Sequence, residues 1–206
     1  VRIMKTINIT TPASNELIRS LRSGDSVSVN GIIVTARDMG HKYLVDAYVD
    51  KKATPEPEVF EKLEKYLHNG IIYHCGPVVR KTGGVWEFVS AGPTTSMREE
   101  IYESKVMKLF DLAGVIGKGG MGKQTLQGCI DNSSVYLHAI GGAGALIAKN
   151  VVRVVDLIKP EFGTPEAFWV IEVKDLFCLV TMDSQGNSLH DKVDADSKKR
   201  FQDLVK

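Results

Sequence analysis

Three cationic side chains stand beside glycine-rich or turn-forming segments at well-separated places in the chain. Arg37 lies in the segment TARDMGHK, Arg98 in AGPTTSMRE and Lys118 in the loop GKGGMG. A guanidinium can fork onto a carboxylate, and a lysine ammonium adds a point charge. Together these residues indicate a site for a small ligand that carries two negative charges.

The loop GKGGMG, residues 117–122, matches the G-x-G-x-x-G pattern of dinucleotide-binding proteins. That pattern also requires an acidic residue about 20 positions further on, and Asp131 is too near while Asp156 is too far. A nicotinamide site is therefore disfavoured. The Walker pattern fails because neither Lys118 nor Lys123 precedes a serine or threonine. The loop either lets backbone amides approach an anion or forms a tight turn with a solvated lysine, and the local sequence favours neither.

The segment AGPTTSMRE, residues 91–99, places three hydroxyl groups at the expected start of a helix. Thr94, Thr95 and Ser96 follow a Gly-Pro turn and precede Arg98. Ordinary helix capping by Thr95 or Ser96, with Arg98 on the surface, is the alternative interpretation. The run of hydroxyls followed by arginine is richer than a cap requires, so all four residues are candidates for ligand contacts.

The segment TARDMGHK, residues 35–42, begins where a strand is expected to end, which is a common place for ligand contacts. The alternative is a charged helix start, in which Asp38 favours the helix dipole and Lys42 lies four residues further on. His41 is interpreted as a surface or structural histidine rather than a ligand.

The elements that must position these residues alternate between strands and helices. β-Branched and aromatic runs predict strands, and apolar residues at helical spacing predict helices. Strands are expected at 5–10, 27–34 (interrupted by a hairpin turn at Asn30-Gly31), 71–75, 78–79, 85–89, 115–116, 135–139, 151–158 (long and buried), 167–173 and 176–182; helices are expected at 14–21, 37–51, 59–68, 96–109, 124–130, 141–150 and 191–206. This order predicts one α/β domain over residues 1–206 with a mixed sheet.

The composition fits an ordinary globular protein, with 43% hydrophobic and 25% charged residues and a formal net charge of +1. Such a balance gives no reason to expect nucleic acid or an anionic membrane as a partner. No apolar run approaches the roughly 20 residues that span a bilayer. The first residues lack the apolar core of a signal peptide, and Met4 is the expected natural start.

Three cysteines, Cys75, Cys129 and Cys178, are widely spaced. An odd number at such spacing is no disulfide framework, and it is no set of iron–sulfur ligands. We therefore expect buried thiols and a reducing, cytoplasmic location.

Five segments together resemble the C-terminal domain, or β subunit, of class I fumarate hydratases and of the related L-tartrate dehydratases. They are TARDMGHK (35–42), AGPTTSMR (91–98), IGKGGM (116–121), YLHAIGGAGALIAK (136–149) and GTPEAFWVIEVKDL…VTMDSQGNSLH (163–190). They span most of the chain in the expected order. The resemblance implies a swivelling β/β/α architecture with a mixed sheet and flanking helices. It also implies a hydro-lyase of the tricarboxylic acid cycle that hydrates fumarate to (S)-malate.

The resemblance also implies roles for individual residues. Arg37, Arg98 and Lys118 would bind the substrate carboxylates, with Thr95 and Ser96 beside them. Thr94 would lie at the substrate carbon and act as the proposed base, helped by a carboxylate of a partner subunit.

A [4Fe–4S] cluster would be held by the cluster-bearing α subunit and not by this chain, and it would act as Lewis acid on the departing hydroxyl. The resemblance further implies a heterotetramer of two α and two β subunits, in which a β–β contact is possible.

Three other hypotheses stay open at this point. The chain could be a tartrate dehydratase β subunit, because substrate choice depends on hydroxyl contacts that the missing subunit would supply. It could be a non-catalytic module that only assembles the partner. A nicotinamide-dependent oxidoreductase is the weakest of the three.

Overall fold

A computed structural model describes residues 6–205 and contains a seven-stranded sheet in the order β1-β2-β3-β6-β7-β9-β8, with a separate two-stranded hairpin, β4-β5. The strands are Ile7–Thr11 (β1), Ser26–Thr35 (β2), Ile71–Tyr73 (β3), Val78–Thr82 (β4), Val85–Ser90 (β5), Gly114–Gly117 (β6), Val135–His138 (β7), Val151–Ile158 (β8) and Phe168–Met182 (β9). The α-helices are Asn15–Ser20 (α1), Asp38–Leu44 (α2), Pro57–Leu67 (α3), Glu100–Phe110 (α4), Lys123–Asn132 (α5), Gly144–Ala148 (α6) and Leu189–Leu204 (α7).

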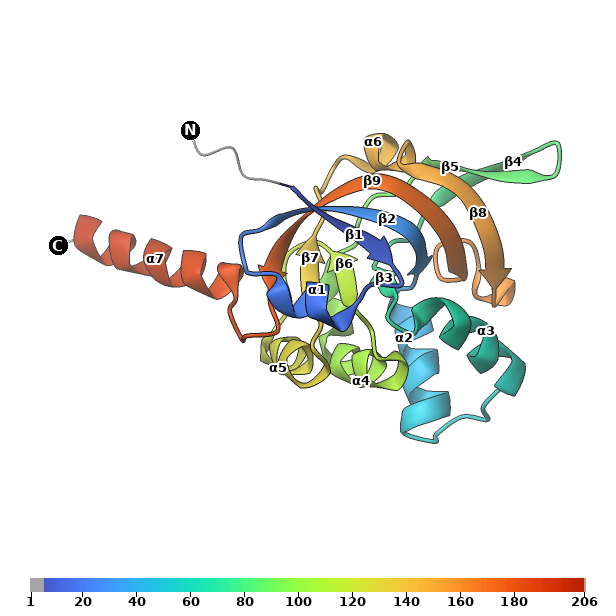
Figure 1. Ribbon diagram of the computed structural model, residues 1–206, viewed down its shortest axis with the longest axis horizontal. Coiled ribbons are helices and arrows are strands. Elements are labelled where there is room, and N and C mark those ends of the chain that lie inside the picture. Colours follow the sequence, from blue (N-terminus) through green and yellow to red (C-terminus); the bar gives the residue numbers. More distant parts are fainter. Residues whose placement is uncertain (1–5, 206) are drawn as a thin grey trace.

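The sheet is mixed, and it closes on itself. Strands β1, β2, β3, β6 and β7 pair in parallel, whereas β9 runs antiparallel to β2, β7 and β8. Because β9 pairs with both β2 and β7, the five strands β2, β3, β6, β7 and β9 form a closed ring (Figure 1). The predicted α/β class with a mixed sheet and flanking helices is confirmed.

Alternate side chains of the strands supply two hydrophobic clusters, as the two-residue period of a strand requires. Ile71, Tyr73 and Leu137 join one cluster, which also receives residues of α1, α6 and the β4-β5 hairpin. Ile72 and Tyr136 join the other, which lies under helices α2 to α5. In Figure 1 these four helices cover one side of the sheet, while α6 and the hairpin lie on the other.

Two predicted breaks in strands are wrong for one shared reason. Asn30 and Gly31 do not form a hairpin turn, because β2 continues through them with Gly31 at φ +96° and a register shift against β9. The segments 167–173 and 176–182 form one strand, β9, in which Asp175 takes φ +54°. The Asn30 side chain accepts a hydrogen bond from the Asp175 amide at 2.9 Å, so the two irregularities support each other across the pair.

Other differences concern exposure and length. Strand β8 is an edge strand and mostly half-buried or exposed, because only β9 covers its backbone, so the expectation of a buried strand is wrong. The glycine- and alanine-rich segment 141–150 gives only the short helix Gly144–Ala148. Gly83 and Gly84, both at positive φ, form the turn between β4 and β5.

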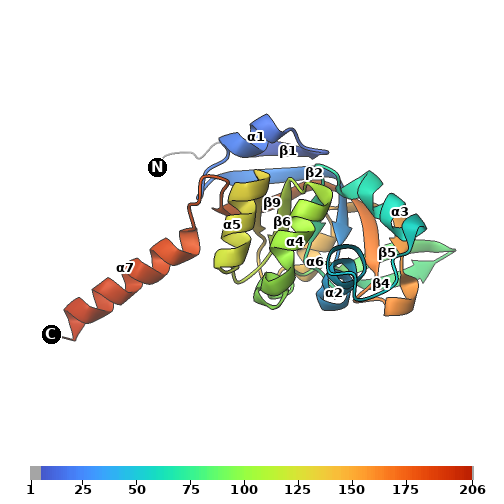
Figure 2. The ribbon, with the colours of Figure 1, turned by 90° about the horizontal axis from the view of Figure 1, so that it is seen from below.

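Helix α7 extends away from the body of the molecule (Figures 1 and 2), and none of its residues is buried. Over residues 6–205, no helix combines the length and the apolar character needed to cross a bilayer. The expected start at Met4 and the outer limits of the predicted domain at Val1 and Lys206 lie outside the described residues, and the single-domain assignment stays a prediction.

Candidate functional site

Two of the predicted residues, Arg37 and Lys118, lie with His74 at the carboxyl ends of three neighbouring parallel strands. Arg37 follows β2, His74 follows β3 and Lys118 follows β6. Strand pairing runs β2 to β3 to β6, so these three chain segments leave the sheet side by side at one edge. Ligands often bind at the ends of strands, because loops can present side chains there without disturbing the core.

Backbone contacts add the segment 93–96 to this edge. Cys75 bridges to Pro93 and Thr95 bridges to Lys118 as short β-contacts. The Thr94 amide donates to the His74 carbonyl at 2.7 Å, and the Ser96 amide donates to the Lys118 carbonyl at 3.0 Å. Main-chain hydrogen bonds therefore join the hydroxyl-rich segment to the glycine loop, which lies 20 or more residues further along the sequence.

Arg98 connects the hydroxyl-rich segment to the start of α2. Its Nη2 donates to Thr94 Oγ1 at 2.8 Å, and its Nε lies 3.1 Å from Asp38 Oδ1. The other oxygen of the same carboxylate, Asp38 Oδ2, lies 3.5 Å from Arg37 Nη2. Asp38 thus stands between two guanidinium groups and brings Arg37 and Arg98 to one place.

Arg37 is held from its other side by Glu166. Its Nε lies 3.3 Å from Glu166 Oε1, while Glu166 Oε2 accepts a hydrogen bond from the Met39 amide in the first turn of α2. A Cβ on Gly76 would lie 2.5 Å from Arg37 Nη1 and 2.9 Å from the Pro165 carbonyl oxygen. The guanidinium therefore occupies space that only glycine leaves free at position 76.

The remaining predicted residues differ in exposure. Thr94 and Lys118 are half-buried, Thr95 is exposed, and Ser96 is completely buried. Thr95 precedes the 3₁₀ turn Ser96–Glu99 that leads into α4, yet its side chain makes no capping hydrogen bond, so the interpretation of this run as ordinary N-caps is not supported. The side chain of Lys118 runs along Gly141, where an added Cβ would lie 3.4 Å from Lys118 Cδ.

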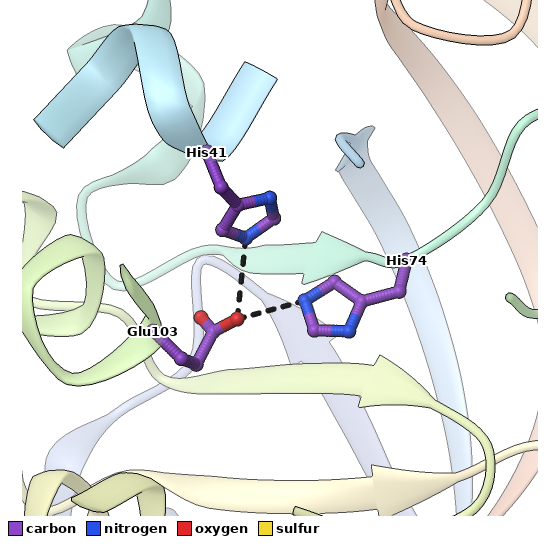
Figure 3. Close-up of side chains that lie close together, drawn as sticks. All are labelled: His41, His74 and Glu103. Atoms are coloured by element: carbon purple, nitrogen blue, oxygen red, sulfur yellow. Dashed lines mark hydrogen bonds and ion pairs between the residues drawn. The ribbon is translucent and has the colours of Figure 1, made fainter. Parts of the chain in front are cut away.

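A buried network of ionisable side chains lies beneath the site (Figure 3). Glu103 Oε2 lies 2.8 Å from His74 Nε2 and 3.2 Å from His41 Nε2, and all three side chains are fully buried. His41 Nδ1 lies 3.0 Å from the Arg37 carbonyl oxygen. The expectation that His41 is a structural histidine fits this position, whereas the alternative of a surface position is wrong.

The second nitrogen of His74 reaches the hydroxyl-rich segment. His74 Nδ1 lies 2.8 Å from Ser96 Oγ, which also accepts a hydrogen bond from the Tyr136 hydroxyl at 2.9 Å. Gly117 faces the same point, since a Cβ there would lie only 1.8 Å from Ser96 Oγ. The Ser96 hydroxyl is thus enclosed by the protein, with both of its partners in the buried network.

The charges of this network compensate each other. Burial alone would raise the pKa of Glu103, but the charges and hydrogen bonds of His41 and His74 outweigh burial and lower it to about 2. Burial would lower the pKa of His41, yet the Glu103 carboxylate outweighs it and the net direction is upward. Burial raises the pKa of Glu99, and both of its carboxyl oxygens lack a hydrogen-bond partner among the described residues.

His41, His74 and Glu103 also form the one group of three metal-ligating residues found within residues 6–205, with ligand atoms no more than 4.8 Å apart. Their separations of 2.8 and 3.2 Å are those of a hydrogen bond and an ion pair, while His41 Nε2 and Glu103 Oε1 have no hydrogen-bond partner among the described residues.

The three cysteines do not gather into any such group in the described part of the chain. All three are buried, and burial raises each thiol pKa, to about 12 for Cys75 and for Cys178. Metal ligation requires the thiolate. This chain's cysteines therefore do not fit an iron–sulfur cluster.

A cavity of about 720 Å³ lies elsewhere, between the β4-β5 hairpin and β8, and none of the predicted site residues lines it. The sequence analysis missed the importance of His74, Glu103 and Glu166. Asp38 and His41 stood in a segment that had been singled out, but no sequence signal connects Glu103 or Glu166 to partners more than 25 residues away.

Comparisons with known proteins identify the family of this chain. Residues 2–193 match the family model described as Fumarase C-terminus. A Geobacillus stearothermophilus protein provisionally named fumarate hydratase class I is 47% identical over 96% of this chain, which spans only 36% of that relative's length. A provisionally named L(+)-tartrate dehydratase subunit beta of Methanocaldococcus jannaschii is 38% identical, with 91% of this chain and 93% of the relative aligned.

The L(+)-tartrate dehydratase subunit beta of Escherichia coli is 36% identical, with 94% of this chain and 89% of that relative aligned. Both enzyme names describe addition or removal of water. The segments that resembled class I fumarate hydratases and L-tartrate dehydratases therefore reflect true kinship, and the chain belongs to the Fumarase C-terminus family of hydro-lyase subunits and domains.

Proposed function

We propose that this chain is the β subunit of a two-subunit hydro-lyase that hydrates fumarate to (S)-malate, and that it binds the dicarboxylate through Arg37, Arg98 and Lys118. The observation that carries the proposal is the pairing of Arg98 with both Thr94 and Asp38, at the edge where Lys118 also leaves the sheet. The names of the relatives support the reaction class.

The guanidinium of Arg98 has donors to spare for a ligand. Arginine carries five N–H groups, of which Asp38 and Thr94 engage two among the described residues. The side chain is 48% exposed, so a carboxylate can reach the remaining donors. Removal of a proton next to a carboxylate builds negative charge on that carboxylate, and fixed cations lower the barrier because they stabilise this charge as it develops.

Thr94 is proposed as the base, or as the group that passes the proton to a carboxylate of the partner. A threonine hydroxyl is a weak base unless a neighbour stabilises its deprotonated form. The Arg98 guanidinium, which donates to Thr94 Oγ1 at 2.8 Å, would supply that stabilisation. The same hydrogen bond fixes the direction of the hydroxyl, and Thr95 beside it contributes an exposed hydroxyl for substrate.

The β-subunit names of two relatives support a partner α subunit, and we propose that this partner bears the cluster. A [4Fe–4S] cluster held there would supply a Lewis acid for the departing hydroxyl. We further propose a heterotetramer with a β–β contact. The buried, reduced thiols are in keeping with a cytoplasmic location, which we also propose.

The test is anaerobic reconstitution with the partner subunit, followed by assays on fumarate, (S)-malate and L(+)-tartrate. The chain alone should be inactive, and the complex should hydrate fumarate. Arg98→Met should lower kcat/KM at least a hundredfold, because a charged hydrogen bond to the substrate contributes about 3 kcal/mol. Exposed Arg80→Met in the β4-β5 hairpin is the matched control and should leave kcat/KM unchanged.

The second candidate is a tartrate dehydratase β subunit. It is favoured by the nearly full-length alignment with two such subunits, in contrast to the one-third coverage of the fumarate hydratase. A higher kcat/KM for L(+)-tartrate than for malate would select it. Unchanged turnover in Thr94→Val and Lys118→Ala would instead indicate a non-catalytic assembly module.

A further inference from the structure

The contacts of the buried network converge on Glu103, which His41 approaches from one side and His74 from the other. The Arg37 carbonyl oxygen can only accept, so His41 Nδ1 must carry a proton. His41 Nε2 lies 3.2 Å from the Glu103 carboxylate, which is an ion-pair separation. This carboxylate raises the pKa of His41 despite its burial, so the imidazolium form of His41 is favoured and pairs with Glu103 in the interior.

His74 joins the same carboxylate to the hydroxyl-rich segment. Its Nε2 lies 2.8 Å from Glu103 Oε2 and donates to it. Its Nδ1 forms a 2.8 Å hydrogen bond with the Ser96 hydroxyl. Ser96 in turn accepts from the Tyr136 hydroxyl, which completes the chain of donors.

We propose that His74 is a positioning residue for the substrate site, and that its Nδ1 holds the Ser96 hydroxyl and so fixes the segment that carries Thr94 and Arg98. This inference rests on the proposed function of that site. It reassigns Ser96, predicted from the sequence as a substrate contact, to the support of its neighbours, because the buried hydroxyl already has two protein partners.

The network reaches every segment of the site from below. His41 ties Glu103 to the backbone of Arg37, and His74 ties Glu103 to Ser96. The main chain adds two further links, from the Thr94 amide to the His74 carbonyl and from the Ser96 amide to the Lys118 carbonyl. A displacement of His74 would therefore shift Thr94 and Arg98 relative to Arg37 and Lys118.

Two substitutions of His74 separate its two contacts. In His74→Asn the side-chain amide lies where Nδ1 was and can still accept from Ser96. In His74→Gln the amide lies near the position of Nε2 and can donate to Glu103, but the Ser96 contact is lost. Both leave a smaller side chain and lower stability. Asp183→Asn is the control, since it removes a buried carboxylate held by the amides of Ser23, Gln185 and Asn187, remote from the site contacts.

The variants are compared in the reconstituted complex. His74→Gln should raise KM for the dicarboxylate about tenfold, the equivalent of one net hydrogen bond, and His74→Asn should restore KM to within about threefold. Asp183→Asn should lower the melting temperature without changing KM, because a loss of folded protein reduces kcat alone. Equal KM values for wild type and His74→Gln would overturn the inference.

A second readout needs no activity. Imidazole ¹⁵N spectra of the histidine-labelled chain should show a buried Nε2 proton that exchanges slowly with water, and its signal should vanish in the His74 variants. If the complex proves inactive while this proton is found, the proposed reaction fails but the network stands. A His74 Nε2 without such a proton would overturn the inference, and so would one equivalent of bound metal that the His74 variants lose.

Discussion

The substitution Glu103→Gln tests whether the interior of the protein contains an ion pair. Glutamine keeps the shape and an accepting oxygen but removes the charge that faces His41 Nε2 at 3.2 Å and His74 Nε2 at 2.8 Å. His41 would then be a buried imidazolium without a counter-charge, or would lose its proton and turn a lone pair toward the glutamine oxygen. Either outcome should destabilise the folded state.

The expected size follows from the acidity of the carboxyl group. Its pKa falls from the usual 4.5 to about 2 in the folded protein, and at 1.36 kcal/mol per pKa unit this corresponds to about 3 kcal/mol of folding free energy. For a chain of this size, about 3 kcal/mol lowers the melting temperature by roughly 10 °C. Breaking a buried pair by removing one partner has a cost of similar order, about 3–5 kcal/mol.

Urea and thermal unfolding at pH 7 would measure the loss, with Glu87→Gln as the matched control. Glu87 pairs with Arg80 on the exposed hairpin, where an ion pair contributes less than about 1 kcal/mol. If Glu103→Gln lost no more stability than Glu87→Gln, the assignment of charges to the buried network would be refuted.

The same pair gives a dependence of stability on pH with a defined sign. The pKa of Glu103 is lowered on folding, so its contribution is present above pH 4.5 and is lost as the pH falls toward 2. The pKa of His41 is raised on folding, so its contribution is present below pH 6.5 and is lost as the pH rises through the raised value. Glu103→Gln should therefore flatten the acid limb of the stability profile between about pH 4.5 and 2, and an unchanged acid limb would contradict the shift.

Three further predictions concern glycines and thiols. Gly117→Ala should lower the melting temperature and raise KM, because the added Cβ would lie 1.8 Å from Ser96 Oγ. Calorimetry and steady-state kinetics measure the two effects. A KM equal to that of the wild type would contradict the enclosure of the Ser96 hydroxyl. Gly76→Ala should raise KM about tenfold or more with a smaller change in kcat, since its Cβ would lie 2.5 Å from Arg37 Nη1; an unaltered KM would argue against Arg37 as a substrate ligand. The three cysteines are buried and their pKa values are raised, so a thiol reagent at pH 8 should label them only slowly until denaturant is added, and rapid labelling of the native chain would show that they are accessible.

Local signals identified most elements but not their interruptions. Asn-Gly is the strongest short hairpin signal in a sequence, yet at Asn30 it forms a bulge because β9 continues along β2 and Asp175 binds the asparagine side chain. The pairing that decides this joins residues 145 positions apart in the chain. Hydrophobic periodicity depends only on residues that are close in the sequence, so it contains no information about a partner strand so far along the chain.

The same limit applies to the site. The sequence identifies three candidate substrate-binding residues, Arg37, Arg98 and Lys118, because each lies beside a short turn-forming or glycine-rich segment. It does not identify the groups that hold them: Glu166 meets Arg37 across 129 positions, and Glu103 meets His74 across 29. An isolated glutamate in a helix looks like any solvated charge until the fold removes it from water.

The ring of strands β2, β3, β6, β7 and β9 has a consequence for synthesis on the ribosome. Its closing strand, Phe168–Met182, bonds to β2, whose residues were made some 140 positions earlier. Until then β2 presents an unpaired edge to the surrounding solution. A non-local closure of this kind slows folding and prolongs the exposure of a half-built sheet, so the nascent chain passes through a stage in which protection by a chaperone has most to offer.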